Sequence, residues 1–140
     1  MIRFYCDSDI ESITKLGSQL HNNYKFKLDT FSKCIVLIKE EKLIGFAVYS
    51  LIYERAELID IIINVSNRKK GYGKKLLDFV LREVISNKCE SITLEVCVNN
   101  MDAINLYSNM GFKKVRLIKN YYFNKKCNQY FDGYIMELKF

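Results

Sequence analysis

Hydrophobic positions along the chain change from strand-like alternation to helical spacing within residues 1–20. Residues 2–5 alternate between apolar and polar types and predict a short strand. A helix is predicted next, because apolar residues then recur at intervals of three or four. They are Ile10, Ile13, Leu16 and Leu20. Ser8 and Glu11 have the spacing of a capping box at the start of this helix, and residues 22–33 predict a loop with a short helix.

Three apolar runs follow and predict neighbouring strands. They cover residues 34–39, 43–51 and 56–65. Glu40-Glu41-Lys42, between the first two runs, has the length and polarity of a hairpin turn. The third run lacks alternation, which is typical of a strand that is buried on both faces.

The second half of the chain alternates between helical and strand-like patterns. Helices are predicted over residues 74–87 and 102–110, and strands over residues 91–96, 113–119 and 134–138. Asn100 can cap the second of these helices, and Gly111 follows it where a left-handed residue would end the helix. Consecutive strands followed by alternating strands and helices predict an α/β (α+β) fold, in which helices cover a mixed sheet.

A glycine-containing turn joins the strand at residues 56–65 to the helix at residues 74–87. Its sequence is Arg68-Lys69-Lys70-Gly71-Tyr72-Gly73. Free backbone N–H groups gather at the start of a helix, where the helix dipole is positive, and glycines let a ligand approach the backbone closely. This arrangement predicts a phosphate-binding turn and therefore a phosphorylated cofactor. The turn matches neither the Walker A pattern nor the full dinucleotide fingerprint, which needs a third glycine.

Composition limits the classes of protein that fit this chain. We expect one domain over residues 1–140, because 49% hydrophobic residues suffice for an ordinary core. No apolar run approaches the roughly 20 residues of a membrane span, and the N-terminus lacks a signal-peptide pattern. The five cysteines fit neither a zinc pattern nor an even disulfide framework, so we expect reduced, mostly buried thiols, no metal site and a cytoplasmic location. The net charge of +6 leaves an anionic cofactor, nucleic acid or an acidic partner as candidate ligands.

Three more blocks follow the turn in a fixed order. They are Leu94-Glu95-Val96, the block at residues 100–112 that contains Asn100, Tyr107 and Gly111, and Asn120-Tyr121-Tyr122 with the later segment Asp132-Gly133-Tyr134-Ile135-Met136. Together with the turn, these blocks resemble the GCN5-related N-acetyltransferase (GNAT) family, and within it the RimI-type ribosomal-protein alanine acetyltransferases. The resemblance is good over residues 56–138 and only architectural before them.

The resemblance implies the GNAT fold, a central mixed and mostly antiparallel sheet of about six or seven strands flanked by about four helices. It also implies acetyl-CoA as the acetyl donor. The donor's pyrophosphate would lie on the turn, which supplies Arg68, Lys69, Lys70, Gly71, Tyr72, Gly73 and Lys74. Its pantetheine arm would pair like an extra strand beside Ile61, Ile62 and Ile63, in a strand whose bulge frees an amide for the thioester oxygen.

By the same resemblance, Glu95 is the general base and Tyr107 the general acid. An amine must lose its proton before it attacks, and the departing thiolate needs a proton, so both roles have a chemical reason. Asn100 would contact the cofactor arm, and Tyr121 and Tyr122 would line the acceptor groove. Because the thioester is already activated, we expect direct transfer within a ternary complex. From the residues alone, Glu95 could equally be a solvent-facing strand residue, and the three tyrosines could be core aromatics.

The acceptor implied by the resemblance is the α-amine of a protein N-terminus, such as that of a ribosomal protein. A small-molecule amine and a lysine side chain are alternatives, because two features depart from the subgroup. Cys97 replaces the usual arginine, and residues 19–28 lack the Pro-Trp character of the subgroup's first loop. A basic nucleic-acid-binding module is a third hypothesis, although aromatics do not interleave with the basic turn as a stacking platform requires. We expect no membrane or direct nucleic-acid partner, and a monomer or weak dimer.

Overall fold

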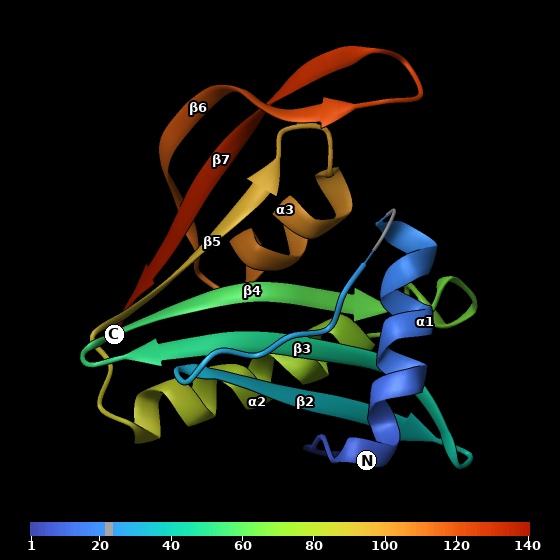
Figure 1. The fold of residues 1–140 in the computed structure, drawn as a ribbon. Coiled ribbons are helices and arrows are strands. Elements are labelled where there is room, and N and C mark those ends of the chain that lie inside the picture. The colour runs from blue at the N-terminus through green and yellow to red at the C-terminus, as the bar shows by residue number, and fades with distance from the viewer. Residues whose placement is uncertain (22–23) are drawn as a thin grey trace.

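Seven strands pair into one mixed sheet in the computed structural model, which describes residues 1–21 and 24–140 (Figure 1). The strands are β1 (Ile2–Phe4), β2 (Ser32–Lys39), β3 (Lys42–Ile52), β4 (Arg55–Ile63), β5 (Ser91–Cys97), β6 (Lys113–Asn124) and β7 (Gln129–Lys139). The helices are α1 (Ile10–Leu20), α2 (Tyr72–Ser86) and α3 (Met101–Asn109), with short 3-10 helices η1 (Asp7–Asp9) and η2 (Val65–Asn67). Within the described residues, none of these helices is long and apolar enough to cross a membrane.

The strands are arranged in the order β1-β2-β3-β4-β5-β7-β6. β4 and β5 are parallel, whereas the other neighbouring pairs are antiparallel. α2 forms the crossover that this parallel pair requires, because the chain must return along the sheet before β5 begins. The predicted mixed, mostly antiparallel sheet of the GNAT fold is therefore confirmed, with three α-helices in the described part of the chain.

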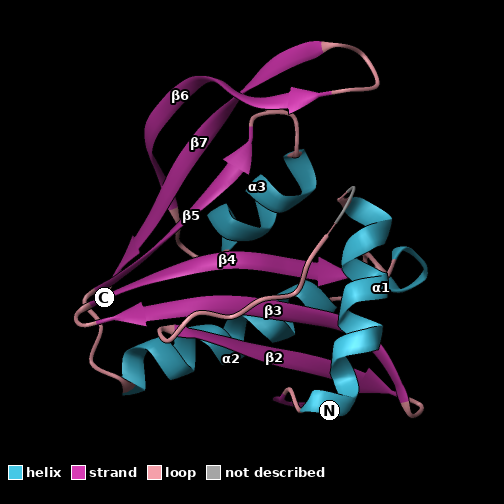
Figure 2. Ribbon diagram, viewed as in Figure 1, coloured by secondary structure: helices cyan, strands magenta, loops and turns pink. Residues whose placement is uncertain are grey.

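β2 and β3 bury both of their faces, and alternate side chains point to opposite sides of the sheet. The expectation that the strand at residues 56–65 is buried on both faces is wrong, because Glu57 and Ile59 of β4 are exposed. On β2, Ile35 and Leu37 belong to the core that α2 and α3 cover, whereas Cys34 and Val36 belong to the core that α1 covers. Figure 2 shows α1 and α2 on opposite sides of β2 and β3. The sheet is thus the middle layer, and the helices close its two sides.

The second half of the chain follows the predicted order closely. The side-chain oxygen of Asn100 accepts a hydrogen bond from the Ala103 amide at 3.3 Å, and Gly111 has a φ of +101°, so both predicted ends of α3 are confirmed. β6 and β7 extend well beyond the predicted strands at residues 113–119 and 134–138. The extension was not visible in the sequence, because most side chains of β6 are exposed at the sheet edge and carry no burial pattern.

The predicted capping box at Ser8 and Glu11 is wrong. The turn that leads into α1 is closed before Ser8, where the Cys6 amide donates a hydrogen bond of 2.8 Å to Oδ2 of Asp9. Ser8 lies inside η1, and α1 begins after Asp9 without a side-chain cap. The cap at Asp9 forms in place of the predicted Ser8–Glu11 cap because Asp9 also has a cationic partner on β1.

Two further expectations about the first part of the chain are wrong. The described residues 24–33 contain no helix, although a short helix was predicted within residues 22–33; residues 22–23 lie outside the described residues. All five cysteines are free, but only Cys34 and Cys89 are buried, so the thiols are not mostly buried.

Asp9 joins β1 to the start of α1 through a paired contact with Arg3. The Arg3 guanidinium donates from Nη1 to Oδ2 at 2.7 Å and from Nη2 to Oδ1 at 3.0 Å. The Arg3 side chain, and then the Cys6 amide, outweigh the desolvation of Asp9 and lower its pKa to about 2. A carboxyl with a lowered pKa stabilises the fold above its unfolded pKa, and this contribution disappears as the pH falls through the folded pKa.

We predict that Asp9→Asn lowers the free energy of unfolding at pH 7 by about 1–2 kcal/mol, allowing for the partial exposure of Arg3. Urea denaturation should show that the difference between the variant and the wild type shrinks between about pH 4 and pH 2, as the wild-type carboxyl takes up its proton. Asp7→Asn, an exposed aspartate in the same turn, is the matched control and should have little effect. A difference for Asp9→Asn that is constant over this pH range would contradict the account.

Candidate active site

β4 and β5 pair for only part of their length. Their parallel register runs from Arg55 opposite Ser91 to Leu58 opposite Leu94. β4 then continues to Ile63 and β5 to Cys97 with no pairing between them. Figure 1 shows the two strands separating beyond this point, with α3 beside the opening. The backbone of residues 59–63 therefore presents a sheet edge inside the molecule, which another extended chain can join.

A β-bulge lies at the start of this free edge. Val48 of β3 pairs with Asp60 and Tyr49 pairs with Leu58, so Ile59 is an extra residue on β4. A bulge turns backbone groups out of the regular ladder. The expected bulge in the strand of Ile61, Ile62 and Ile63 is therefore present, just before those residues.

The glycine-containing turn follows β4 after the short 3-10 helix η2. Arg68 fastens it to the strand, since its Nε donates to the carbonyl of Ile63 at 3.0 Å. Lys69 and Gly71 both have positive φ, +60° and +85°, on either side of Lys70. Alternation of right- and left-handed residues points successive N–H groups into one concavity that suits an anion. Apart from Gly71 itself and its two chain neighbours, no atom of the described residues lies within 4 Å of the place where a Cβ on Gly71 would be, so the space beside this residue is open.

Tyr107 approaches the opening from the face of the sheet that α2 and α3 cover. It is buried on α3, with its ring 5.8 Å from that of Phe112. Burial raises the pKa of Tyr107 to about 12, and the charges of Asp60 and Tyr122 add to the rise. The phenol is therefore protonated at neutral pH and has a proton to give.

Glu95 lies on the opposite face of β5 from Leu94 and Val96, on the side of α1, and is exposed. A side-chain hydrogen bond to Glu95 is the main cause of the raised pKa of Tyr121. Burial raises the pKa of Tyr122 to about 12, and Glu95 is the next cause. The two tyrosine rings meet edge to face at 5.1 Å. The structure thus brings together Glu95, Tyr121 and Tyr122.

Two carboxylates near the opening were missed by the sequence analysis. Asp60, next to the bulge, is half-buried, and burial raises its pKa while His21 opposes the rise. Glu57 lies near Glu95, and its pKa is raised by burial and then by the Glu95 charge. The available signal for Asp60 was a single acid inside an otherwise apolar run at residues 58–63.

A hollow of about 600 Å³ lies between the end of α1 and the β6–β7 hairpin. Its lining includes Gln19, Leu20, His21, Cys97 and Tyr122. The volume is in the range of small-ligand sites. Both features that depart from the RimI-type subgroup, Cys97 and the segment that begins at residue 19, contribute to this lining.

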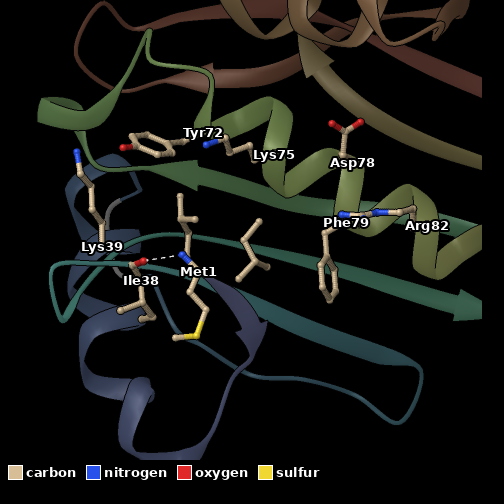
Figure 3. Close-up of a pocket in the computed structure, with 10 residues that line it drawn as sticks. Met1, Ile38, Lys39, Tyr72, Lys75, Asp78, Phe79 and Arg82 are labelled. Carbon is tan, nitrogen blue, oxygen red and sulfur yellow. Dashed lines mark hydrogen bonds between the residues drawn. The ribbon is translucent and has the colours of Figure 1, made fainter.

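A second hollow of about 540 Å³ lies beside α2, β1 and the end of β2 (Figure 3). Of the residues predicted to form the site, only Tyr72 lines it. Its ring lies between Lys39 and Lys75, whose Nζ atoms are 5.4 and 5.5 Å from the ring centroid. The neighbouring Lys39 ammonium group is the main cause that lowers the pKa of Tyr72. The side chain of Tyr72 is thus directed away from the β4–β5 opening, so only its backbone can serve the turn.

Comparison with known proteins agrees with this geometry. Residues 2–112 match the model of the Acetyltransferase (GNAT) family. The chain is 28% identical over 102 residues to the [ribosomal protein bS18]-alanine N-acetyltransferase of Salmonella typhimurium, covering 73% of this chain and 68% of that relative. The Escherichia coli counterpart is 29% identical, and the matched part spans 61% of this chain and 58% of that protein.

Solved structures agree on the fold. The crystal structure of the ribosomal-protein-S18-alanine N-acetyltransferase from Escherichia coli superposes with a TM-score of 0.88 at 22% identity, covering 99% of this chain and 92% of that one. The spermidine/spermine N-acetyltransferase SpeG from Vibrio cholerae gives 0.84 at 21% identity, covering 99% and 91%. With its family model matched over most of its length, the chain belongs to the GNAT family of acetyltransferases.

Proposed function

We propose that this protein transfers the acetyl group of acetyl-CoA to a primary amine, in the simplest case the α-amine of a protein N-terminus in the cytoplasm. The observation that carries the proposal is the free edge of β4 at residues 59–63, which the glycine-containing turn follows along the chain. A donor that carries an amide-containing arm at one end of a pyrophosphate fits a free strand edge followed by such a turn. The arm would add to the edge beside Ile61, Ile62 and Ile63, and the pyrophosphate would lie on the amides of Lys69 to Lys74.

The reacting groups reach the opening from its two sides. The amine nitrogen attacks the thioester carbonyl carbon, a C–N bond forms and the C–S bond breaks. Glu95 takes the proton that the amine loses, and Tyr107 gives a proton to the departing sulfur. Tyr107 is protonated at neutral pH, as the second role requires, and its burial places it on the covered face of the sheet, opposite the exposed Glu95. An amide near the bulge at Ile59 would stabilise the oxyanion.

Asn100 has a structural task that restricts its part in this scheme. Its side-chain oxygen accepts from the Ala103 amide and caps α3. A contact with the cofactor arm would therefore come from its side-chain NH₂ group or its backbone.

The hollow beside α1 is the candidate acceptor groove, because Tyr122 lines it and Glu95 lies next to the tyrosine pair. The bS18-alanine relatives favour a peptide N-terminus as the occupant. The departures at Cys97 and at residues 19–21 change the lining of this same groove, so the acceptor can differ from bS18 while the donor stays the same. A small polyamine is the second candidate, since SpeG shares the fold.

The experiment that tests the proposal is acetyl transfer measured by mass spectrometry on a panel of acceptors. The panel contains a peptide with a free N-terminal alanine, the same peptide with a blocked N-terminus and an internal lysine, and spermidine. Transfer confined to the free N-terminus is the expected result. Transfer to spermidine alone, or to the lysine alone, would replace the proposed acceptor. No affinity for acetyl-CoA combined with salt-sensitive RNA binding would overturn the proposal.

We predict that Gly71→Val reduces acetyl-CoA affinity at least tenfold, a loss of about 1.4 kcal/mol or more, because a β-branched residue resists positive φ and its Cβ fills the concavity. Calorimetric titration measures the affinity, and a thermal melt verifies that the protein is folded. Gly71→Asn is the matched variant, since asparagine tolerates positive φ, and it should retain more affinity than the valine variant. Unchanged binding in Gly71→Val would place the pyrophosphate elsewhere.

We predict that Glu95→Gln lowers kcat/KM by about 100-fold or more at pH 7 in steady-state kinetics, with acetyl-CoA affinity unchanged, because glutamine cannot accept the proton of the amine. Asp60→Asn is the comparison, because Asp60 is the half-buried acid nearest in sequence to the bulge. If Glu95→Gln keeps the wild-type kcat/KM while Asp60→Asn loses it, Asp60 is the base and Glu95 is not.

A further inference from the structure

The segment Asp132-Gly133, which none of the proposed chemical steps uses, lies opposite an irregularity in β6. Ile118 pairs with Gly133 and Tyr122 pairs with Phe131, so residues 119–121 of β6 lie opposite Asp132 alone. Asn120, in the middle of this bulge, has a φ of +54°. Asparagine tolerates positive φ, but the backbone groups of a bulge leave the regular ladder and need support from other partners.

Asp132 supplies that support from β7. Its Oδ1 accepts a hydrogen bond of 2.9 Å from the backbone amide of Asn120, at the centre of the bulge. Its own backbone carbonyl accepts from the Val98 amide at 3.0 Å, which continues the contact of β7 with the end of β5. Asp132 thus links the bulge to the strand that carries Glu95.

Gly133 makes room for the two tyrosines that the bulge presents. It is buried and pairs with Cys97 of β5 on one side and Ile118 of β6 on the other. A Cβ on Gly133 would lie 2.9 Å from Cε2 of Tyr122 and 3.0 Å from Cδ2 of Tyr121. Real Cβ atoms essentially never show the distance to Tyr122, and the distance to Tyr121 is tighter than nine in ten real contacts, so both rings pack closely on the bare backbone of Gly133.

The bulge and the glycine together fix where the tyrosine pair lies. The rings are held over β7 beside Cys97, where Tyr122 lines the hollow next to α1 and Tyr121 interacts with Glu95. Without the bulge, a regular strand would alternate and send Tyr121 and Tyr122 to opposite faces of the sheet. The insertion is what allows consecutive tyrosines to serve the same groove.

We propose that Asp132 and Gly133 are positioning residues of the acceptor site, which hold Tyr121 and Tyr122 against the groove and so set acceptor binding without affecting the donor. This inference rests on the proposed function for its kinetic consequence. Its geometric consequence, the seating of both rings on Gly133, is independent of any activity.

The kinetic test compares Asp132→Ala with Asp132→Asn in the full-length protein, using whichever amine of the panel the wild type acetylates. Asp132→Ala should raise the acceptor KM about tenfold, the factor expected for the loss of one hydrogen bond, with the acetyl-CoA Kd unchanged. Asp132→Asn keeps an oxygen acceptor for the Asn120 amide and should recover most of the loss. Asp29→Ala is the matched control, because Asp29 Oδ1 accepts from the Phe31 amide at the same distance, 2.9 Å, away from the groove. It should not change the acceptor KM.

The structural test uses nuclear Overhauser contacts between the Gly133 α-protons and the rings of Tyr121 and Tyr122. These contacts should be present in the wild type, Asp132→Asn and Asp29→Ala, and absent or weakened in Asp132→Ala. Gly133→Ala is the second variant, and it should displace the rings and raise the acceptor KM even if Asp132→Ala does not fold.

Three results would overturn the inference. The first is an unchanged acceptor KM in Asp132→Ala, and the second is an Asp132→Asn variant as impaired as Asp132→Ala, which would assign the effect to charge. The third is persistence of the ring contacts in folded Asp132→Ala. If the wild type acetylates no amine, the proposed function fails, and the ring contacts alone then decide whether Asp132 and Gly133 position the tyrosines.

Discussion

The separation of β4 from β5 after Leu58 and Leu94 is the constraint on which the rest of the site depends. Parallel strands that kept pairing to their ends would leave no backbone groups for a ligand and no passage between the two faces of the sheet. The bulge at Ile59 begins the free part of β4, and the glycine-containing turn follows this strand after η2. Under the proposed function, the donor's arm and its pyrophosphate would therefore find their partners along one continuous stretch of chain. The helix that begins at this turn, α2, is also the crossover that makes the parallel pair possible.

The opening joins two environments of different polarity. Tyr107 is buried on the side of α2 and α3, where desolvation keeps its phenol protonated. Glu95 is exposed on the side of α1, in the company of the tyrosine pair and a second carboxylate, Glu57. The sheet thus separates a buried phenol from an exposed carboxylate. Under the proposed mechanism, these two groups would act on the thioester and the amine from opposite sides of the opening.

The sequence predicted the parts of this arrangement that depend on local pattern. The apolar run that became β4, the helix α2 and both ends of α3 follow from spacing, glycine placement and capping, and the motif order identified the family. Features that depend on contacts between distant segments were missed. Asp9 was chosen over Ser8 because Arg3, on a different strand, pairs with it. The bulge at residues 119–121 lies against Asp132 and Gly133 of another strand, and neither the local propensity of β6 nor its exposed side chains indicate it. The sequence shows Asp60 as an acid in an apolar run. Only the separation of β4 from β5 shows that this acid lies beside the opening.

The central claim is that acetyl-CoA binds along the free edge of β4 and onto the following turn. Amide hydrogen exchange, measured residue by residue by NMR with and without acetyl-CoA, tests it most directly. The account predicts slower exchange within residues 59–63 and 69–74 on addition of acetyl-CoA, with no change in the paired amides of β2. Binding of acetyl-CoA that leaves those two segments unchanged, or that protects only the hollow lined by Lys39, Tyr72 and Lys75, would contradict it.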